Sequence, residues 1–102
     1  MELKFKKTCG DLTVYVYGEL DECVASNVKI ILDKLIYENT DAKKVIFDLS
    51  GLSFMDSTGI GLLIGRYKKL KNIGVPSYIT GASVCIEKVI ELAGLYRIMP
   101  KF

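Results

Sequence analysis

The fold is decided by residues 45–74, which read VIFDLSGLSFMDSTGIGLLIGRYKKLKNIG. Val45–Leu49 is a short, nearly continuous apolar run, which is typical of a strand covered on both faces in a parallel sheet flanked by helices. A loop is expected over Ser50–Asp56. Apolar side chains then recur at helical spacing until Gly74, which is placed to end a helix: Ile60, Leu63, Ile64, Tyr67 and Leu70. The stretch therefore predicts a strand, a loop and a helix of an α/β fold.

The residues before this stretch predict a hairpin followed by a helix. Apolar and polar side chains alternate over Leu3–Phe5 and again over Leu12–Tyr17, and Cys9-Gly10-Asp11 supplies turn residues between the two runs. Asp21 is well placed to cap a helix. Apolar residues then recur at helical spacing over Val24–Ile36, which predicts the first helix.

The residues after the stretch predict a strand, a helix and a last short strand. The strand is expected over Val75–Thr80, the helix between Gly81-Ala82-Ser83 and Gly94, and the last strand over Arg97–Met99. The element order is thus β-β-α-β-α-β-α-β. It predicts one α/β domain over residues 1–102, with a mixed, mostly parallel sheet, an N-terminal hairpin and flanking helices.

Composition excludes several classes of function. The net charge of +2 does not indicate a nucleic-acid partner, and we interpret the basic run Arg66–Lys71 as a solvated helix face. The chain has no histidine, which removes Ser–His and Cys–His nucleophile pairs and most zinc sites. Its three cysteines, Cys9, Cys23 and Cys85, form no C-x-x-C pair, as is typical of reduced, semi-buried thiols in a cytosolic protein. We expect a cytoplasmic monomer without a membrane span, a cofactor, a metal or an enzymatic activity.

A candidate site is expected where two strands lead into helices. Partners of open α/β sheets meet the chain beyond the carboxyl ends of the strands, and two such loops carry Asp21 and Asp56-Ser57-Thr58. A phosphate on Ser57 would carry about −1.5 to −2 charges and would lie at a helix N-terminus, beside Asp56. Local sequence by itself favours plain helix capping by these residues. Thr58 is a second hydroxyl, although a threonine in the first helical turn more often serves the backbone.

Two further patterns in the same stretch have structural interpretations. Gly59, Gly61 and Gly65 miss the G-x-G-x-x-G spacing of a nucleotide site by one residue, and no acidic residue follows about 20 positions later. We interpret Gly61 and Gly65 as a helix face that approaches the sheet closely. Phe54 and Met55 are interpreted as plugs that insert the loop into the core.

The motif F-M-D-S-T-G at Phe54–Gly59, followed by Gly65-Arg66-Tyr67-Lys68, closely resembles the signature of anti-sigma factor antagonists of the STAS family. The resemblance is closest to the sporulation antagonists of that family. Gly18-Glu19-Leu20-Asp21 is similar to the family's G-E-L-D loop, and Ser83–Leu95 resembles its last helix. The resemblance covers nearly the whole chain and implies a STAS fold.

The resemblance also implies a partner-switching function. In such systems the unphosphorylated antagonist binds an anti-sigma factor that is a serine kinase, which frees a sigma factor. The kinase phosphorylates the serine after the motif's aspartate, here Ser57, and a phosphatase reverses the modification. By position, Asp21, Asp56, Thr58 and Gly59 would complete the partner-binding site around Ser57.

Two departures and two alternatives accompany this hypothesis. Glu22-Cys23 replaces other polar residues that the sporulation relatives carry after the aspartate, and the chain ends at Phe102, where relatives often add a helix. One alternative is a STAS module that acts as a scaffold or ligand sensor. The other is a weak nucleotide hydrolase, which would need a phosphate loop or metal cluster that the sequence lacks.

Overall fold

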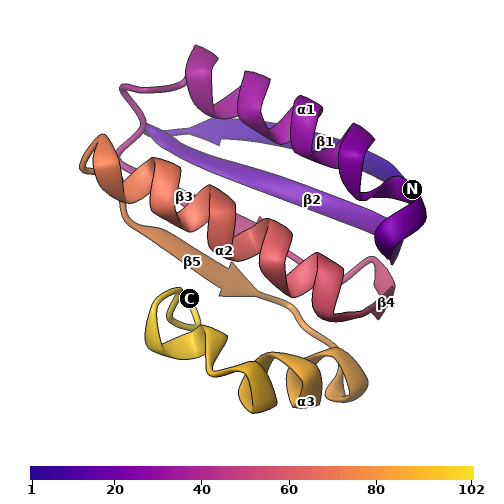
Figure 1. Ribbon diagram of the computed structural model, residues 1–102. Coiled ribbons are helices and arrows are strands. Elements are labelled where there is room, and N and C mark those ends of the chain that lie inside the picture. Colours follow the sequence, from indigo (N-terminus) through magenta and orange to yellow (C-terminus); the bar gives the residue numbers. More distant parts are fainter.

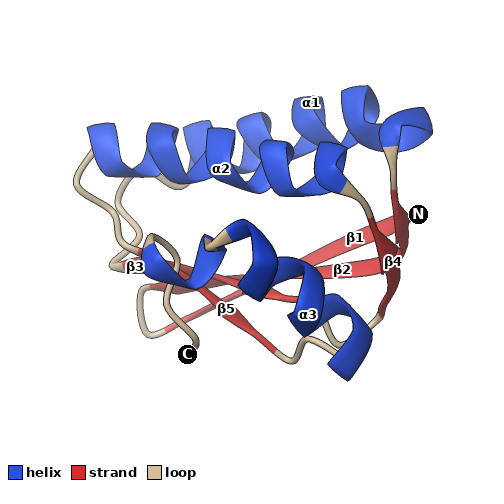
Figure 2. Ribbon diagram, turned by 60° about the horizontal axis from the view of Figure 1, so that its bottom comes forward, coloured by secondary structure: helices blue, strands red, loops and turns tan.

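The computed structural model describes all residues, 1–102, and shows a mixed sheet with helices packed on it (Figure 1). The elements are β1 (Glu2–Thr8), β2 (Asp11–Leu20), α1 (Glu22–Glu38), β3 (Lys44–Asp48), β4 (Leu52–Met55), α2 (Ser57–Asn72), β5 (Ser77–Thr80), α3 (Val84–Ala93) and a 3-10 turn (Leu95–Arg97). Helices α1 and α2 lie side by side across one face of the sheet, and α3 lies at its β5 edge (Figures 1 and 2). None of the helices is long and apolar enough to cross a bilayer.

The sheet has the order β1-β2-β3-β5, and β4 pairs with the far end of β2. β1 and β2 form the predicted antiparallel hairpin, whereas every other pair is parallel. The hairpin turns on Cys9 and Gly10, whose φ angles of 53° and 88° are both positive. Two positive φ angles are what a two-residue hairpin loop needs to match the twist of its strands. The mixed, mostly parallel α/β fold expected from the sequence is therefore confirmed.

The core lies between the sheet and the α1–α2 layer. On β2, Leu12, Val14 and Val16 are buried, while the residues between them face the other side and keep some exposure. This alternation follows from the two-residue period of a strand. Each helix contributes one apolar stripe to the core: Val28, Leu32, Leu35 and Ile36 from α1, and Ile60, Leu62, Leu63 and Leu70 from α2.

Two predicted elements differ in the structure. The expected loop over Ser50–Asp56 contains the short strand β4, which the apolar pattern of only four residues did not reveal. The last strand expected over Arg97–Met99 is wrong, because the N–H groups of Ile98 and Met99 return to the Leu95 carbonyl in a 3-10 turn. Met99 is fully buried. The C-terminal segment after the 3-10 turn pairs with the sheet only at a single bridge between Ile79 and Lys101.

A buried cation joins α1 to α2. Arg66 is only 4% exposed, and its Nε lies 3.0 Å from Oδ1 of Asp33 on α1. Lys69 Nζ lies 3.2 Å from the other oxygen of the same carboxylate. The Arg66–Asp33 contact has the distance of an ion pair without the alignment of a hydrogen bond. The prediction that the basic run forms a solvated helix face is therefore wrong for Arg66, which is buried.

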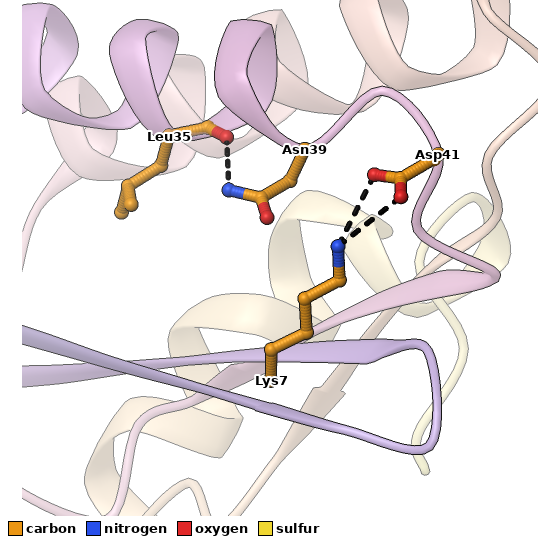
Figure 3. A network of polar contacts seen from close by, with 4 residues as sticks. All are labelled: Lys7, Leu35, Asn39 and Asp41. Carbon is orange, nitrogen blue, oxygen red and sulfur yellow. Dashed lines mark hydrogen bonds and ion pairs between the residues drawn. The ribbon is translucent and has the colours of Figure 1, made fainter.

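Polar contacts also fasten the end of α1 to β1 (Figure 3). The Asn39 side-chain amide donates to the Leu35 carbonyl at 2.8 Å, which satisfies one of the free carbonyls at the helix end. Lys7 Nζ donates to both oxygens of Asp41, at 3.2 and 3.3 Å. The hydrogen bond from Lys7 lowers the pKa of the Asp41 carboxyl below its ordinary value.

The Arg66–Asp33 contact predicts the effect of removing the carboxylate. We expect Asp33→Ala to lower the free energy of unfolding by about 2 kcal/mol, because it leaves a buried guanidinium without its counter-charge. Urea unfolding followed by circular dichroism measures this loss. In the double variant Asp33→Ala/Arg66→Leu, part of the loss is recovered, since no buried charge remains unpaired. A loss as large in the double variant as in Asp33→Ala would contradict this account.

The Lys7–Asp41 contact predicts a pH dependence. Because the pKa of Asp41 is lowered in the folded state, its stabilising effect is present at neutral pH and is lost as the pH falls through that pKa. We expect Lys7→Gln to raise the Asp41 pKa toward its ordinary value. An NMR titration of the Asp41 side-chain carboxyl in both proteins measures the change, and equal midpoints would show that Lys7 has no influence.

Candidate functional site

Helices α1 and α2 begin next to each other at one edge of the sheet. β2 and β4 are parallel, and Leu20 pairs with Met55 at their carboxyl ends. Asp21 and Asp56 follow these paired residues directly, and the Asp56 N–H lies 3.4 Å from the Leu20 carbonyl. Paired strands are about 4.8 Å apart, so the two loops share one edge, as the sequence predicted. The neighbour of β2 at this point is β4, however, and not the strand over residues 44–48.

Both aspartates are N-caps. Asp21 Oδ1 accepts from the N–H groups of Cys23 and Val24, at 3.0 and 3.3 Å. Asp56 Oδ1 accepts from the N–H groups of Thr58 and Gly59, at 2.9 and 3.2 Å. A side-chain oxygen at this position satisfies the free N–H groups of the first helical turn. The capping role expected from local sequence is therefore confirmed, and the side chain that fills it at α2 is Asp56.

Because Asp56 provides the cap, the Ser57 hydroxyl is left free. Ser57 is the first residue of α2, its side chain is exposed, and its hydroxyl makes no hydrogen bond within the chain. Thr58, the other hydroxyl of the motif, is half-buried in the same turn. An enzyme that approaches this edge would therefore reach the Ser57 hydroxyl more readily than that of Thr58.

Gly59 allows α2 to start this close to the strands. A Cβ atom at position 59 would lie 2.6 Å from Met55 Cγ and 3.0 Å from the Leu20 carbonyl oxygen, so any larger residue would displace the helix start. The close approach predicted for Gly61 and Gly65 is wrong, because a Cβ at either position would meet no atom within 4 Å. These two glycines lie on the side of α2 that faces away from the sheet, and nothing in the packing explains them.

Phe54 and Met55 point to opposite sides of β4. Met55 is 3% exposed and inserts into the core as predicted, whereas Phe54 is 46% exposed. The prediction that both residues plug the loop into the core is thus right for Met55 only. Successive side chains of a strand alternate between its faces, so recognising β4 in the sequence would have revealed that Phe54 is exposed. An exposed aromatic ring therefore lies three residues before Ser57.

The edge also carries uncompensated negative charge. Glu19, Asp21 and Glu22 lie on the β2–α1 side of this edge and Asp56 on the β4–α2 side, and none of the four forms an ion pair. Glu22 and Cys23 are exposed in the first turn of α1, and the semi-burial expected for the cysteines is wrong, because all three are exposed. We call the surface formed by the exposed or half-buried residues at this edge the α1–α2 rim: Glu19, Asp21, Glu22, Phe54, Asp56, Ser57 and Thr58. No group of three or more metal-ligating residues is present, and the cavities of the structure lie elsewhere.

Comparison with known proteins relates the whole chain to one family. Residues 2–102 match the STAS domain. An anti-sigma-B factor antagonist of Staphylococcus aureus is 33% identical over 101 residues, covering 97% of this chain and 92% of the relative. An anti-sigma F factor antagonist of Paenibacillus polymyxa is 28% identical over 100 residues, covering 98% of this chain and 85% of the relative. Antagonists of the anti-sigma F and the anti-sigma-B factors thus match at comparable identity, so the sporulation branch is not singled out.

Solved structures show the same fold. The anti-sigma factor antagonist SpoIIAA in its unphosphorylated form superposes with a TM-score of 0.81 at 24% identity, covering 99% of this chain and 88% of SpoIIAA. An anti-sigma factor antagonist from Mycobacterium paratuberculosis gives a TM-score of 0.85 at 24% identity, covering 99% of this chain and 84% of that protein. Because residues 2–102 match the STAS domain and an antagonist 33% identical is covered over almost its whole length, the chain belongs to the STAS family and to its anti-sigma factor antagonists.

Proposed function

We propose that the unphosphorylated chain binds an anti-sigma factor serine kinase through the α1–α2 rim and thereby frees a sigma factor for transcription. Phosphorylation of Ser57 by that kinase ends the complex, and a serine phosphatase restores it. The observation that carries this proposal is the exposed, unbonded Ser57 hydroxyl at the start of α2. Asp21, Asp56, Thr58 and Gly59 shape the surface around it.

The chemistry requires only a hydroxyl from this chain. The kinase transfers the γ-phosphoryl group of ATP to Ser57 Oγ, so that a new P–O bond forms, the bond to the β-phosphate oxygen breaks and ADP leaves. The kinase supplies the base that takes the hydroxyl proton. In this proposal the chain is a substrate and regulator without a catalytic role. Because ATP and sigma factors are found in the cytoplasm, we place the switch there.

Charge explains how the phosphate ends binding. A phosphoserine carries about −1.5 to −2 charges at neutral pH, and the N-terminus of α2 favours an anion. The same phosphate stands beside Asp56 and close to Asp21 and Glu22, which have no counter-ions. A partner surface that accommodates a neutral hydroxyl among these acids would have to desolvate a much denser negative charge. Like charges brought together at an interface cost several kcal/mol.

The relatives support this proposal. SpoIIAA has been solved in an unphosphorylated and in a phosphorylated form, and both superpose on this chain, with TM-scores of 0.81 and 0.73. The relatives named as antagonists of anti-sigma factors supply the class of partner. Phosphorylation of a STAS domain with this fold is thus compatible with the packing seen here.

The position of the phosphate is the first test. After incubation with a cognate anti-sigma kinase and ATP, we expect mass spectrometry to place one phosphate on Ser57. Thr58→Ala should be modified as fast as the wild type, and Ser57→Ala should remain unmodified, because only the exposed hydroxyl reaches the kinase. Phosphate on Thr58, or on any residue outside the rim, would overturn the assignment.

The effect of charge at the rim is the second test. In calorimetric titration without ATP, we expect Ser57→Asp to bind the kinase at least tenfold more weakly than the wild type, which corresponds to about 1.4 kcal/mol or more. Ser57→Ala should bind normally. Asn72→Asp adds the same charge at the far end of α2 and is the matched control, so it should also bind normally. Equal affinity of Ser57→Asp and the wild type would contradict the electrostatic account.

A further inference from the structure

A cavity lies at the end of α2 that is remote from Ser57. It has a volume of about 340 Å³ and opens between the last turns of α2, the start of β5 and the C-terminal segment. Figure 1 shows this region, where the C-terminus runs back beside β5. Its walls are largely aromatic and aliphatic: Tyr67, Val75, Pro76, Tyr78, Ile98 and Pro100. The 16 residues of α2 span about 24 Å, so this cavity is separate from the α1–α2 rim.

A buried hydroxyl without a partner lies in the cavity wall. Ser77 is 3% exposed, and its Oγ makes no hydrogen bond. Ser77 pairs with Val45 and lies on the same side of β5 as the fully buried Ile79, the side that α2 covers. Buried polar atoms in folded proteins are almost always hydrogen-bonded, and an exception needs an explanation. Its Oγ is closed to solvent in this structure, so a bound molecule with an acceptor oxygen would provide the missing partner once the Ser77 side chain rotates toward the cavity, because a serine hydroxyl can donate one hydrogen bond.

The charge of the cavity is positive. Lys71 is the one charged residue in its wall, and its ammonium group lies 5.9 Å from the centre of the Tyr67 ring without any ion-pair partner. No aspartate or glutamate lines the cavity. An ammonium group next to an apolar pocket attracts an anion, and a carboxylate also matches the unused Ser77 hydroxyl.

We propose that this cavity binds a small carboxylic acid with an apolar body, such as an aromatic or medium-chain acid. The carboxylate is held by Lys71 and Ser77, and the apolar body contacts the ring of Tyr67 and the side chain of Ile98. The size is suitable, because a dry cavity of about 150 Å³ in another protein already holds benzene. This ligand site does not depend on Ser57 or on a kinase, so it stands or falls independently of the partner-switching proposal.

The test uses benzoate and hexanoate as probes, with benzyl alcohol as a neutral probe of similar shape to benzoate. We expect amide chemical shifts of the ¹⁵N-labelled chain to change at residues 67–78 and 98–100, and to saturate at millimolar acid. Benzyl alcohol should bind about tenfold more weakly, since it lacks the charge that pairs with Lys71. Absence of saturable shifts with both acids, or equal affinity for benzyl alcohol, would overturn the proposal.

Three variants assign the contacts. Lys71→Gln should weaken benzoate binding about tenfold, and Ser77→Ala about fivefold, through the loss of a charge-assisted and a neutral hydrogen bond. Lys68→Gln removes the same charge from an exposed residue outside the cavity and should bind benzoate as the wild type does. Thermal unfolding without ligand shows that each variant is folded, and Ser77→Ala should be no less stable than the wild type, because the hydroxyl has no partner there.

Two other results would contradict the assignment. If Lys71→Gln and Ser77→Ala both bind benzoate as tightly as the wild type, the acid does not occupy this cavity. If the same amides shift with protein concentration in the absence of acid, a second copy of the chain fills the cavity instead. Either result leaves the proposed role of Ser57 unaffected, because the phosphorylation and kinase-binding measurements do not involve this cavity.

Discussion

The pairing of Leu20 with Met55 is the constraint on which the rest of the rim depends. It places the last residues of β2 and β4 side by side, so that the next residue of each segment caps a helix at the same edge. Gly59 makes the arrangement possible, because the first turn of α2 lies against the Leu20 carbonyl and Met55 with no room for a Cβ. Two helix N-termini with their capping aspartates are thereby brought together from positions 35 residues apart in the sequence.

Within this arrangement, neighbouring residues have separate tasks. Asp56 satisfies the free N–H groups of α2, and Gly59 allows the close packing, so that Ser57 is left without a structural role. A serine that capped its own helix would have its hydroxyl engaged with the backbone. In this motif the aspartate and the glycine therefore have structural roles, and the serine between them keeps a free hydroxyl. The surrounding acids make the surface sensitive to any charge added at that hydroxyl.

The two ends of α2 differ in chemistry, and both differ from its middle. At the N-terminus the surface is acidic and open, whereas at the C-terminus Lys71 stands beside an apolar cavity with an unpaired serine hydroxyl. Between these two ends, the buried side chain of Arg66 forms an ion pair with Asp33 and so joins α2 to α1. A buried charge costs free energy unless it is paired, so this contact restricts how α1 and α2 pack against each other. The relative position of Asp21 and Asp56 depends on that packing as well as on the strands.

Residue patterns were enough to predict the class of the fold, most of its elements and the chemistry of the motif. Apolar periodicity located the hairpin, the three helices and the strands at residues 45–49 and 75–80, because these patterns reflect which face of a local element is buried. The residues around Asp21 and Ser57 also predicted that the site lies at one edge of the sheet. The three-dimensional fold was needed to show that β4 exists, that Phe54 is exposed, that Arg66 is buried and that residues 97–99 form no strand. Each of these depends on contacts between residues distant in the chain, and a local pattern of three or four residues carries too little information to predict them. The same holds for the cavity beside Ser77, which exists only because the C-terminal segment returns to β5.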